Sequence, residues 1–282
     1  MSTQKNPLTQ FYRVVKTTVK LPSRGLYYKK NEVDFNEDNE VGILPMTAAD
    51  EITLKNPDAL LSCEAIVNVI KSCVPAVKKP KQLLSCDIET LIVGIRDASY
   101  GDDLSMEIRC PECSHNNTYS LDLDSLLNQT EQLEDEYVAE LSNDIQVYVK
   151  PGTFDATLKH QKILINNKKI GRLVDQDDIS NEQREALLNS VFNSLGKLQY
   201  ELILDGIEKV VYLDEEGNEQ EVTEKRFIDD FIRNIDATEI NKIETKLKEA
   251  NSVGIAKEMP AVCTNCGHEW EAAIEFNPVN FS

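Results

Sequence analysis

Two short stretches, Arg109-Cys110-Pro111-Glu112-Cys113-Ser114-His115 and Val262-Cys263-Thr264-Asn265-Cys266-Gly267-His268, decide how this chain can fold. In each, two residues separate the cysteines, so a tight turn directs both sulfur atoms toward one point. Ser114 and Gly267 follow the second cysteine, where such a turn favours a positive φ. Two pairs supply the four ligands of a tetrahedral site with Zn–S distances of about 2.3 Å. We therefore predict one zinc ion per chain in a split zinc ribbon, bound by Cys110, Cys113, Cys263 and Cys266.

Two other uses of paired cysteines compete with the zinc site. A redox-active pair is expected between a strand and a helix, whereas a strand-like alternation from Thr118 to Leu123 follows the first pair here. Disulfides fit an oxidising compartment, whereas this chain has an odd number of cysteines, seven, and starts without a secretory signal. His115 and His268 could replace a ligand, but since four thiols are available we expect both imidazoles beside the site or exposed.

The predicted site and the rest of the sequence argue against catalysis. Four thiolates leave no open position for water or substrate, so the predicted zinc is structural. The sequence contains no phosphate-binding glycine loop, dinucleotide fingerprint, His-Glu-x-x-His helix or nucleophile elbow. His160 lies outside the cysteine stretches without an evident partner, and we expect it to be solvated. We therefore predict a protein that is not an enzyme and has no small-molecule substrate.

Composition narrows the class of protein and its partners. The 282 residues are 41% hydrophobic and 28% charged, as expected for a soluble globular protein of one large or two ordinary domains. The net charge of −19 disfavours nucleic acid, and the basic run 78–81 is short. No apolar run approaches the roughly 20 residues of a membrane span. Synthesis in a reducing cytoplasm is expected, with Cys63, Cys73 and Cys86 packed as small apolar side chains.

The pattern of the chain predicts an α+β fold with three parts. Residues 1–143 would form an N-terminal α+β domain with the first zinc knuckle. Residues 144–256 would form a mostly helical insertion. Residues 257–282 would carry the second zinc knuckle and a C-terminal strand that packs back on the first. The acidic run from Glu131 to Glu136 marks the first boundary.

Capping residues, prolines and glycines indicate where the expected helices and strands begin and end. Strands are expected at 11–21, 41–44, 104–108, 145–149 and in the alternating segment 270–276. Capping boxes at Thr47–Asp50 and Ser180–Gln183 each begin a helix. Helices are expected after Thr47 and at 58–73, 87–100, 153–167, 180–195, 224–235 and 238–250. Residues 198–213 fit either helix or strand, and we favour a helix followed by a hairpin at 214–218.

Four further segments carry a resemblance to a known family. They are Leu21-Pro22-Ser23-Arg24-Gly25, Thr47-Ala48-Ala49-Asp50-Glu51, Asn56-Pro57-Asp58-Ala59-Leu60-Leu61-Ser62 and, after the second cysteine pair, Phe276-Asn277-Pro278-Val279-Asn280-Phe281. With them the chain resembles the baseplate hub and hub-assembly family of contractile-tailed, T-even-like bacteriophages. The resemblance covers residues 10–127 and 223–282. It departs where the family leads us to expect a glycine near Cys63 and an aromatic residue at Ser282.

This resemblance implies a non-enzymatic protein of the virion tail baseplate, or of its assembly, made in the cytoplasm of the infected host. Its partners would be other hub, tail-tube or wedge proteins. Candidate partner-binding residues come from the proline-glycine turn, which we expect to expose Arg24, and from the aromatic tail. They are Arg24, Tyr27, Tyr28, Phe276 and Phe281. Three functions stay open: a structural hub subunit, an assembly chaperone absent from the finished particle, and a nucleic-acid-binding zinc-ribbon regulator.

Overall fold

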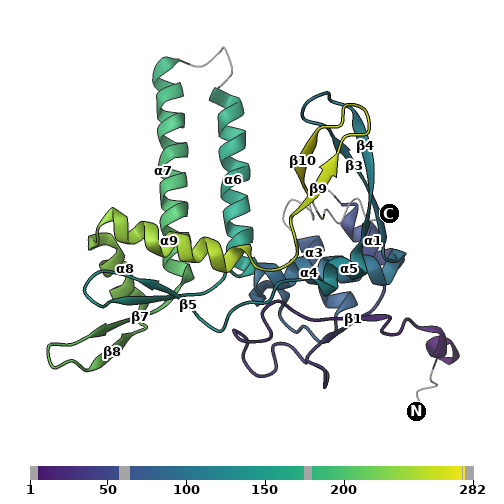
Figure 1. Cartoon of the computed structure of the whole chain (residues 1–282), viewed down its shortest axis with the longest axis horizontal. Coiled ribbons are helices and arrows are strands. Elements are labelled where there is room, and N and C mark those ends of the chain that lie inside the picture. The colour runs from purple at the N-terminus through teal and green to yellow at the C-terminus, as the bar shows by residue number, and fades with distance from the viewer. Residues whose placement is uncertain (1–5, 57–63, 175–179, 275, 277–282) are drawn as a thin grey trace. The chain divides into compact units, whose positions relative to one another are not determined.

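The computed structural model describes residues 6–56, 64–174, 180–274 and 276, and it combines helices with small antiparallel sheets, as the predicted α+β class requires (Figure 1). The chain divides into two compact units. Unit 1 contains Met1–Pro80, Cys86–Gln132 and Gly254–Ser282, and unit 2 contains Lys81–Ser85 and Leu133–Val253. Within the described residues, no helix is both long enough and apolar enough to cross a lipid bilayer.

Unit 1 is a helical core that carries three two-stranded antiparallel sheets. The sheets pair β1 (Thr17–Val19) with β2 (Val41–Ile43), β3 (Asp103–Arg109) with β4 (Asn116–Asp122), and β9 (Glu258–Val262) with β10 (Glu269–Ala273). The helices are η1 (Pro7–Phe11), α1 (Ala48–Leu54), α3 (Glu64–Cys73), η2 (Pro80–Gln82), α4 (Ser85–Tyr100) and α5 (Leu123–Asn128). Only the first residue of η2 belongs to unit 1.

The ends of these helices follow the predicted signals. Thr47 and Asp50 form the expected capping box of α1, in which each side chain accepts a hydrogen bond from the other residue's backbone N–H. In α4, Gly94 allows a close approach to β1 and β2, because a Cβ atom there would lie 2.5 Å from Ile43 Cδ1 and 2.9 Å from Val19 Cγ1. The described part of the helix expected at 58–73 begins at Glu64, and residues 57–63 lie outside the described range.

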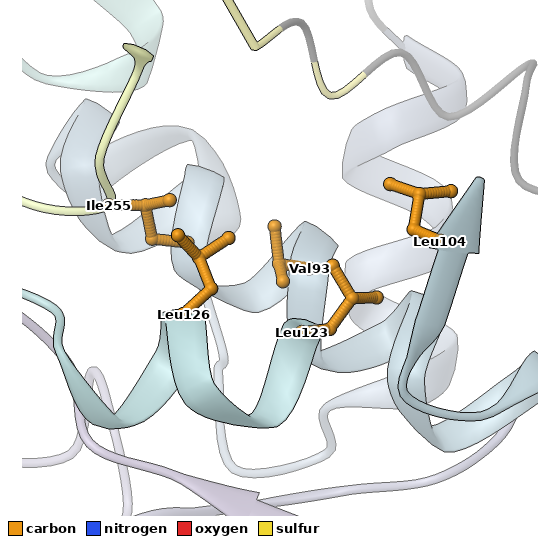
Figure 2. Packing of buried hydrophobic residues seen from close by; sticks show 5 residues of the cluster. All are labelled: Val93, Leu104, Leu123, Leu126 and Ile255. Atoms are coloured by element: carbon orange, nitrogen blue, oxygen red, sulfur yellow. The ribbon is translucent and has the colours of Figure 1, made fainter. Parts of the chain in front are cut away.

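A buried apolar cluster joins distant segments of unit 1 (Figure 2). Val93 of α4 and Leu104 of β3 meet Leu123 and Leu126 of α5. Ile255, which precedes β9 in the sequence, completes the cluster with 2% of its surface exposed. Both cysteine hairpins therefore start from one core, since Leu104 is the second residue of β3 and β9 begins three residues after Ile255.

Unit 2 combines a four-stranded antiparallel sheet with four helices. The sheet order is β5 (Tyr137–Glu140), β6 (Gln146–Val149), β7 (Ile207–Leu213) and β8 (Glu219–Val222). The helices are α6 (Phe154–Val174), α7 (Asn181–Gly206), α8 (Lys225–Asn234) and α9 (Ala237–Ser252). The capping box of Ser180 and Gln183 begins α7 as predicted.

Two expectations about local structure need correction. The strand expected at 11–21 is confined to Thr17–Val19, because Arg13 holds the preceding segment by donating to the backbone oxygens of Pro45 and Ser72, each at 2.7 Å. The ambiguous segment 198–213 is helical only up to Gly206 and a strand from Ile207, while the hairpin expected at 214–218 joins β7 to β8. Gly206 ends α7 at a point of close packing, since a Cβ atom there would collide with the side chain of Leu247.

Candidate metal centre

The two cysteine hairpins of unit 1 have the same backbone geometry. The N–H of Cys110 donates to His115 O at 2.9 Å, and that of Cys263 donates to His268 O at 2.8 Å. Ser114 has a φ of 60° and Gly267 a φ of 72°, as the predicted turns require. In both, the residue before the first cysteine pairs with the residue after the histidine: Arg109 with Asn116, and Val262 with Glu269.

The four cysteine sulfur atoms converge. Cys110 Sγ lies 3.8 Å from Cys266 Sγ, Cys113 Sγ lies 3.6 Å from Cys263 Sγ, and all four sulfurs lie within 4.8 Å of one another. A disulfide bond would require about 2.05 Å, so these thiols are not cross-linked. Tetrahedral zinc with Zn–S bonds of about 2.3 Å has S···S edges of about 3.8 Å. The donor set therefore fits a tetrahedral metal ion.

The four cysteine ligands differ in exposure. Cys110 and Cys263 are 1% and 2% exposed, whereas Cys113 and Cys266 face solvent. Burial opposes ionisation of Cys263, yet the backbone N–H groups of Cys266 and Asn265 donate to its sulfur and lower the pKa of this thiol to about 6. The thiolate is the form that binds metal, so these two N–H groups favour the ligand form of Cys263.

Side-chain amides join the two hairpins around the sulfurs. Asn117, 2% exposed, donates to Cys263 Sγ at 3.7 Å and accepts from the N–H and hydroxyl of Thr264, both at 2.9 Å. Asn265 donates to Cys113 Sγ at 3.7 Å, so the bridging runs in both directions. Asn117 was not among the residues predicted for this site, because its only signal in the sequence was a polar residue at a strand position that proves to be buried.

Aromatic side chains form further contacts within and between the two hairpins. The Tyr119 hydroxyl donates to Val262 O at 3.0 Å, and its ring meets that of Trp270 edge to face at 6.5 Å. His268 stacks on Trp270 with 5.8 Å between ring centroids, while His115 is exposed. Since the potential metal-binding group consists of the four cysteines alone, both imidazoles lie where the sequence placed them, outside the ligand set.

The residues of the proline-glycine turn bind within their own unit. Ser23 donates its backbone N–H to Asp87 Oδ1 at 2.9 Å, and the Tyr28 hydroxyl donates to Asp87 Oδ2. Burial raises the pKa of Asp87, which is inaccessible to solvent. Arg24 is half-buried, with a φ of 51°, and not exposed as we expected. Tyr27 is also half-buried, so this turn is anchored by the core of unit 1.

The other sequence-predicted residues fall into three groups. Phe276 packs against the apolar cluster of Figure 2, and Phe281 lies outside the described residues. Cys73 and Cys86 are buried as predicted, and burial raises the pKa of the Cys73 thiol to about 11. His160 is half-buried and not solvated as expected, and burial lowers its pKa.

Comparison with known proteins identifies a family. The sequence profile of the family described as T4 bacteriophage base plate protein matches residues 15–281, which includes both cysteine hairpins and the segment between them. No curated protein matches the chain, and no solved structure matches it. Because the family profile spans nearly the whole sequence, the chain belongs to the T4 bacteriophage base plate protein family.

Proposed function

We propose that this chain is a non-enzymatic structural component of the phage tail baseplate, located in the hub region and bound to other baseplate proteins. The family match supports a structural role in the baseplate. A part of a contractile tail transmits force between its neighbours, so its fold must resist local opening. The feature that best serves this role is the four-sulfur cluster, because it joins two hairpins that are about 150 residues apart in the sequence.

The metal in this proposal is one structural zinc ion bound by Cys110, Cys113, Cys263 and Cys266. The single supporting observation is the fit of four converging sulfurs to a tetrahedral site. Four thiolates saturate zinc, so the bound ion would stabilise the fold without presenting a reactive position. The free energy of binding would add to the free energy of unfolding, since the unfolded chain keeps the two pairs apart.

Elemental analysis of the purified, reduced protein tests the metal. We expect about one zinc per chain, released by acid as the thiolates are protonated. A protein without metal whose cysteine pairs are oxidised to disulfides would contradict the proposal. Iron in place of zinc would keep the structural role and change the ion.

Mass spectrometry of purified phage particles tests the location. A baseplate subunit should give peptides of this chain in a fixed ratio to those of known tail proteins. Abundant peptides in assembly intermediates with none in finished particles would instead indicate an assembly chaperone. Cross-linking of the intact particles would then identify the neighbours. Retention on DNA at moderate salt would indicate the nucleic-acid-binding alternative, which the net charge of −19 disfavours.

A further inference from the structure

The segment from η1 to the start of β1 in unit 1 exposes large apolar side chains (purple in Figure 1). They are Leu8, Phe11, Tyr12, Val14 and Val15, which are between 54% and 76% exposed. The sequence predicts a strand at 11–21, whereas the residues paired with another strand are Thr17–Val19. An exposed apolar segment of high strand propensity promotes aggregation unless a partner covers it. We name residues 7–16 the arm.

Hydrogen bonds hold the arm at both of its ends. The Asn6 side chain accepts the N–H of Leu8 at 3.0 Å and caps η1. Further along, the guanidinium of Arg13 is bound by backbone oxygens of unit 1, and the N–H of Lys16 donates to Ile43 O at 2.9 Å. A segment that is already ordered loses less conformational entropy when it binds, so the arm is preorganised for a partner.

The backbone of the arm has unused hydrogen-bonding groups. The N–H groups of Arg13, Val14 and Val15 have no hydrogen-bond partner in the described part of the chain. Residues 13–16 are in neither a helix nor a turn, and Tyr12 before them is extended, with a φ of −68° and a ψ of 154°. An extended segment with free main-chain groups and exposed side chains is suited to join the open edge of a sheet as an added strand.

The arm lies in the basic part of an acidic chain. Residues 1–31 contain seven lysine and arginine residues and neither aspartate nor glutamate, while the other 23 basic residues stand against 49 acidic ones. Arg13 is used within unit 1, whereas Lys16 and Lys20 are exposed. Segregation of charge on this scale favours a partner surface that is acidic.

Strand β8 of unit 2 has an open edge. It is the last strand in the order β5-β6-β7-β8, and Glu219, Gln220 and Glu221 in it are exposed. The N–H of Asp214 donates to Asn218 O at 2.9 Å in the turn that joins β7 to β8. Hydrogen-bonded and non-hydrogen-bonded pairs alternate along an antiparallel ladder, so the N–H groups of Glu219 and Glu221 point away from β7.

This edge complements the arm in charge and in apolar character. Residues 214–221 contain five acidic residues and no basic residue. Beside β8, Tyr212 and Leu213 of β7 are 39% and 51% exposed. The edge therefore combines free main-chain groups, carboxylates and exposed apolar side chains. The arm offers the same three features with the opposite charge.

We propose that the arm of one copy of this chain adds as a strand to the β8 edge of a second copy. The free main-chain groups of the two strands pair, and Tyr12 and Val14 cover Tyr212 and Leu213 of the partner subunit. At physiological salt, charges more than about 8 Å apart are largely screened, so local attraction outweighs the net charge of −19 on each copy. The two surfaces differ, so the contact is head-to-tail and repeats into a ring or an open chain.

Sedimentation of the purified full-length chain tests the proposal with one variant on each surface. Val14→Asp puts a carboxylate into the arm, and Glu219→Pro removes an outward N–H from β8, as an edge strand tolerates. The parent should associate as its concentration rises, and each variant should raise the dissociation constant at least about tenfold. Gln10→Asp and Glu219→Gln are the matched controls, and each should change it no more than about fivefold. All four should melt like the parent, because the altered side chains are exposed.

A mixture of the two disruptive variants identifies the surfaces that meet. Val14→Asp keeps the β8 edge and Glu219→Pro keeps the arm, so their equimolar mixture should form a one-to-one dimer that grows no further. A mixture that stays monomeric would overturn the pairing of arm and edge. A parent that is monomeric at all attainable concentrations would overturn the proposal and leave the arm to another baseplate protein. Association of the parent that neither variant weakens would also overturn it.

Discussion

The side-chain amide of Asn117 lies across the two cysteine hairpins, donating to Cys263 Sγ at 3.7 Å while its oxygen accepts the backbone N–H of Thr264 at 2.9 Å. One side chain from β4 thus positions a sulfur ligand and the turn that follows it. Groups that contact metal ligands orient them and stabilise their charged form. The same amide also donates to His115 O at 3.2 Å, so it braces the turn of its own hairpin as well.

Asn117→Ala should weaken zinc binding about 10- to 100-fold, as is usual when a group that orients a ligand is lost. Competition with a chromophoric chelator would measure the change. Asn116→Ala is the matched control, because Asn116 is exposed and adjacent, and it should bind zinc like the parent. Equal affinity in both variants would mean that the four sulfurs need no support from Asn117.

Loss of one ligand should cost far more than loss of a buried thiol elsewhere. Cys110→Ser or Cys263→Ser should remove most of the zinc and strongly lower the melting temperature, since metal binding contributes folding free energy. Cys73→Ala, at a fully buried position, should cost only about 1 kcal/mol. Calorimetry with parallel zinc analysis would compare the melting temperatures and zinc contents of the three variants. Ligand variants that melt like the parent would show that the two hairpins do not share a metal ion.

The sequence predicted those features of the fold and the site that depend on residues close together in the chain. The capping box of Thr47 and Asp50 and the spacing of each cysteine pair could be read directly, because each involves residues within four positions of one another. The support from Asn117 could not, since its contacts reach 147 positions along the chain. The end of α7 depends on packing against Leu247, and the half-buried state of Arg24 depends on the core beneath its turn, so neither could be predicted locally.

Alanine substitution at two helical glycines should change the free energy of unfolding in opposite directions. Gly94→Ala should destabilise unit 1 by about 1–3 kcal/mol, because the added Cβ would lie 2.5 Å from Ile43 Cδ1 in a packed core. Gly196→Ala in α7 meets no atom within 4 Å and should stabilise its helix by about 0.5–1 kcal/mol. Thermal melts of both variants test this pair. Equal effects would mean that the core beside Gly94 adjusts at little cost.

A buried amide in the α6–α7 hairpin has no partner among the described residues. Asn167 is 8% exposed, and neither its amide nitrogen nor its oxygen forms a hydrogen bond there. Asn167→Leu keeps the branch at Cγ and removes the unpaired polar atoms, so it should raise the free energy of unfolding by about 1–3 kcal/mol. Asn189→Leu, at an exposed position of α7, should change it little. A destabilised Asn167→Leu variant would show that the amide is paired in solution.

Phe276 and the residues after it should serve different purposes. Phe276 packs against the cluster of Val93, Leu104, Leu123, Leu126 and Ile255, so Phe276→Ala should lower the free energy of unfolding by about 1–3 kcal/mol. Deletion of residues 277–282 leaves this anchor and all four cysteines in place. We therefore expect the truncated chain to bind zinc and melt like the parent.

The segment 277–282 remains our candidate for contact with a neighbouring subunit, because Phe281 offers an aromatic side chain of the kind enriched at interface cores. Incorporation of the truncated chain into baseplates should then fall, which complementation of a phage lacking the gene would measure. Phe281→Ala should reproduce the defect, whereas Val279→Ala serves as the control in the same segment. A truncated chain that assembles and melts normally would show that the segment binds nothing. A lowered melting temperature would place its contact within the chain, because only an internal contact contributes to the stability of the isolated protein.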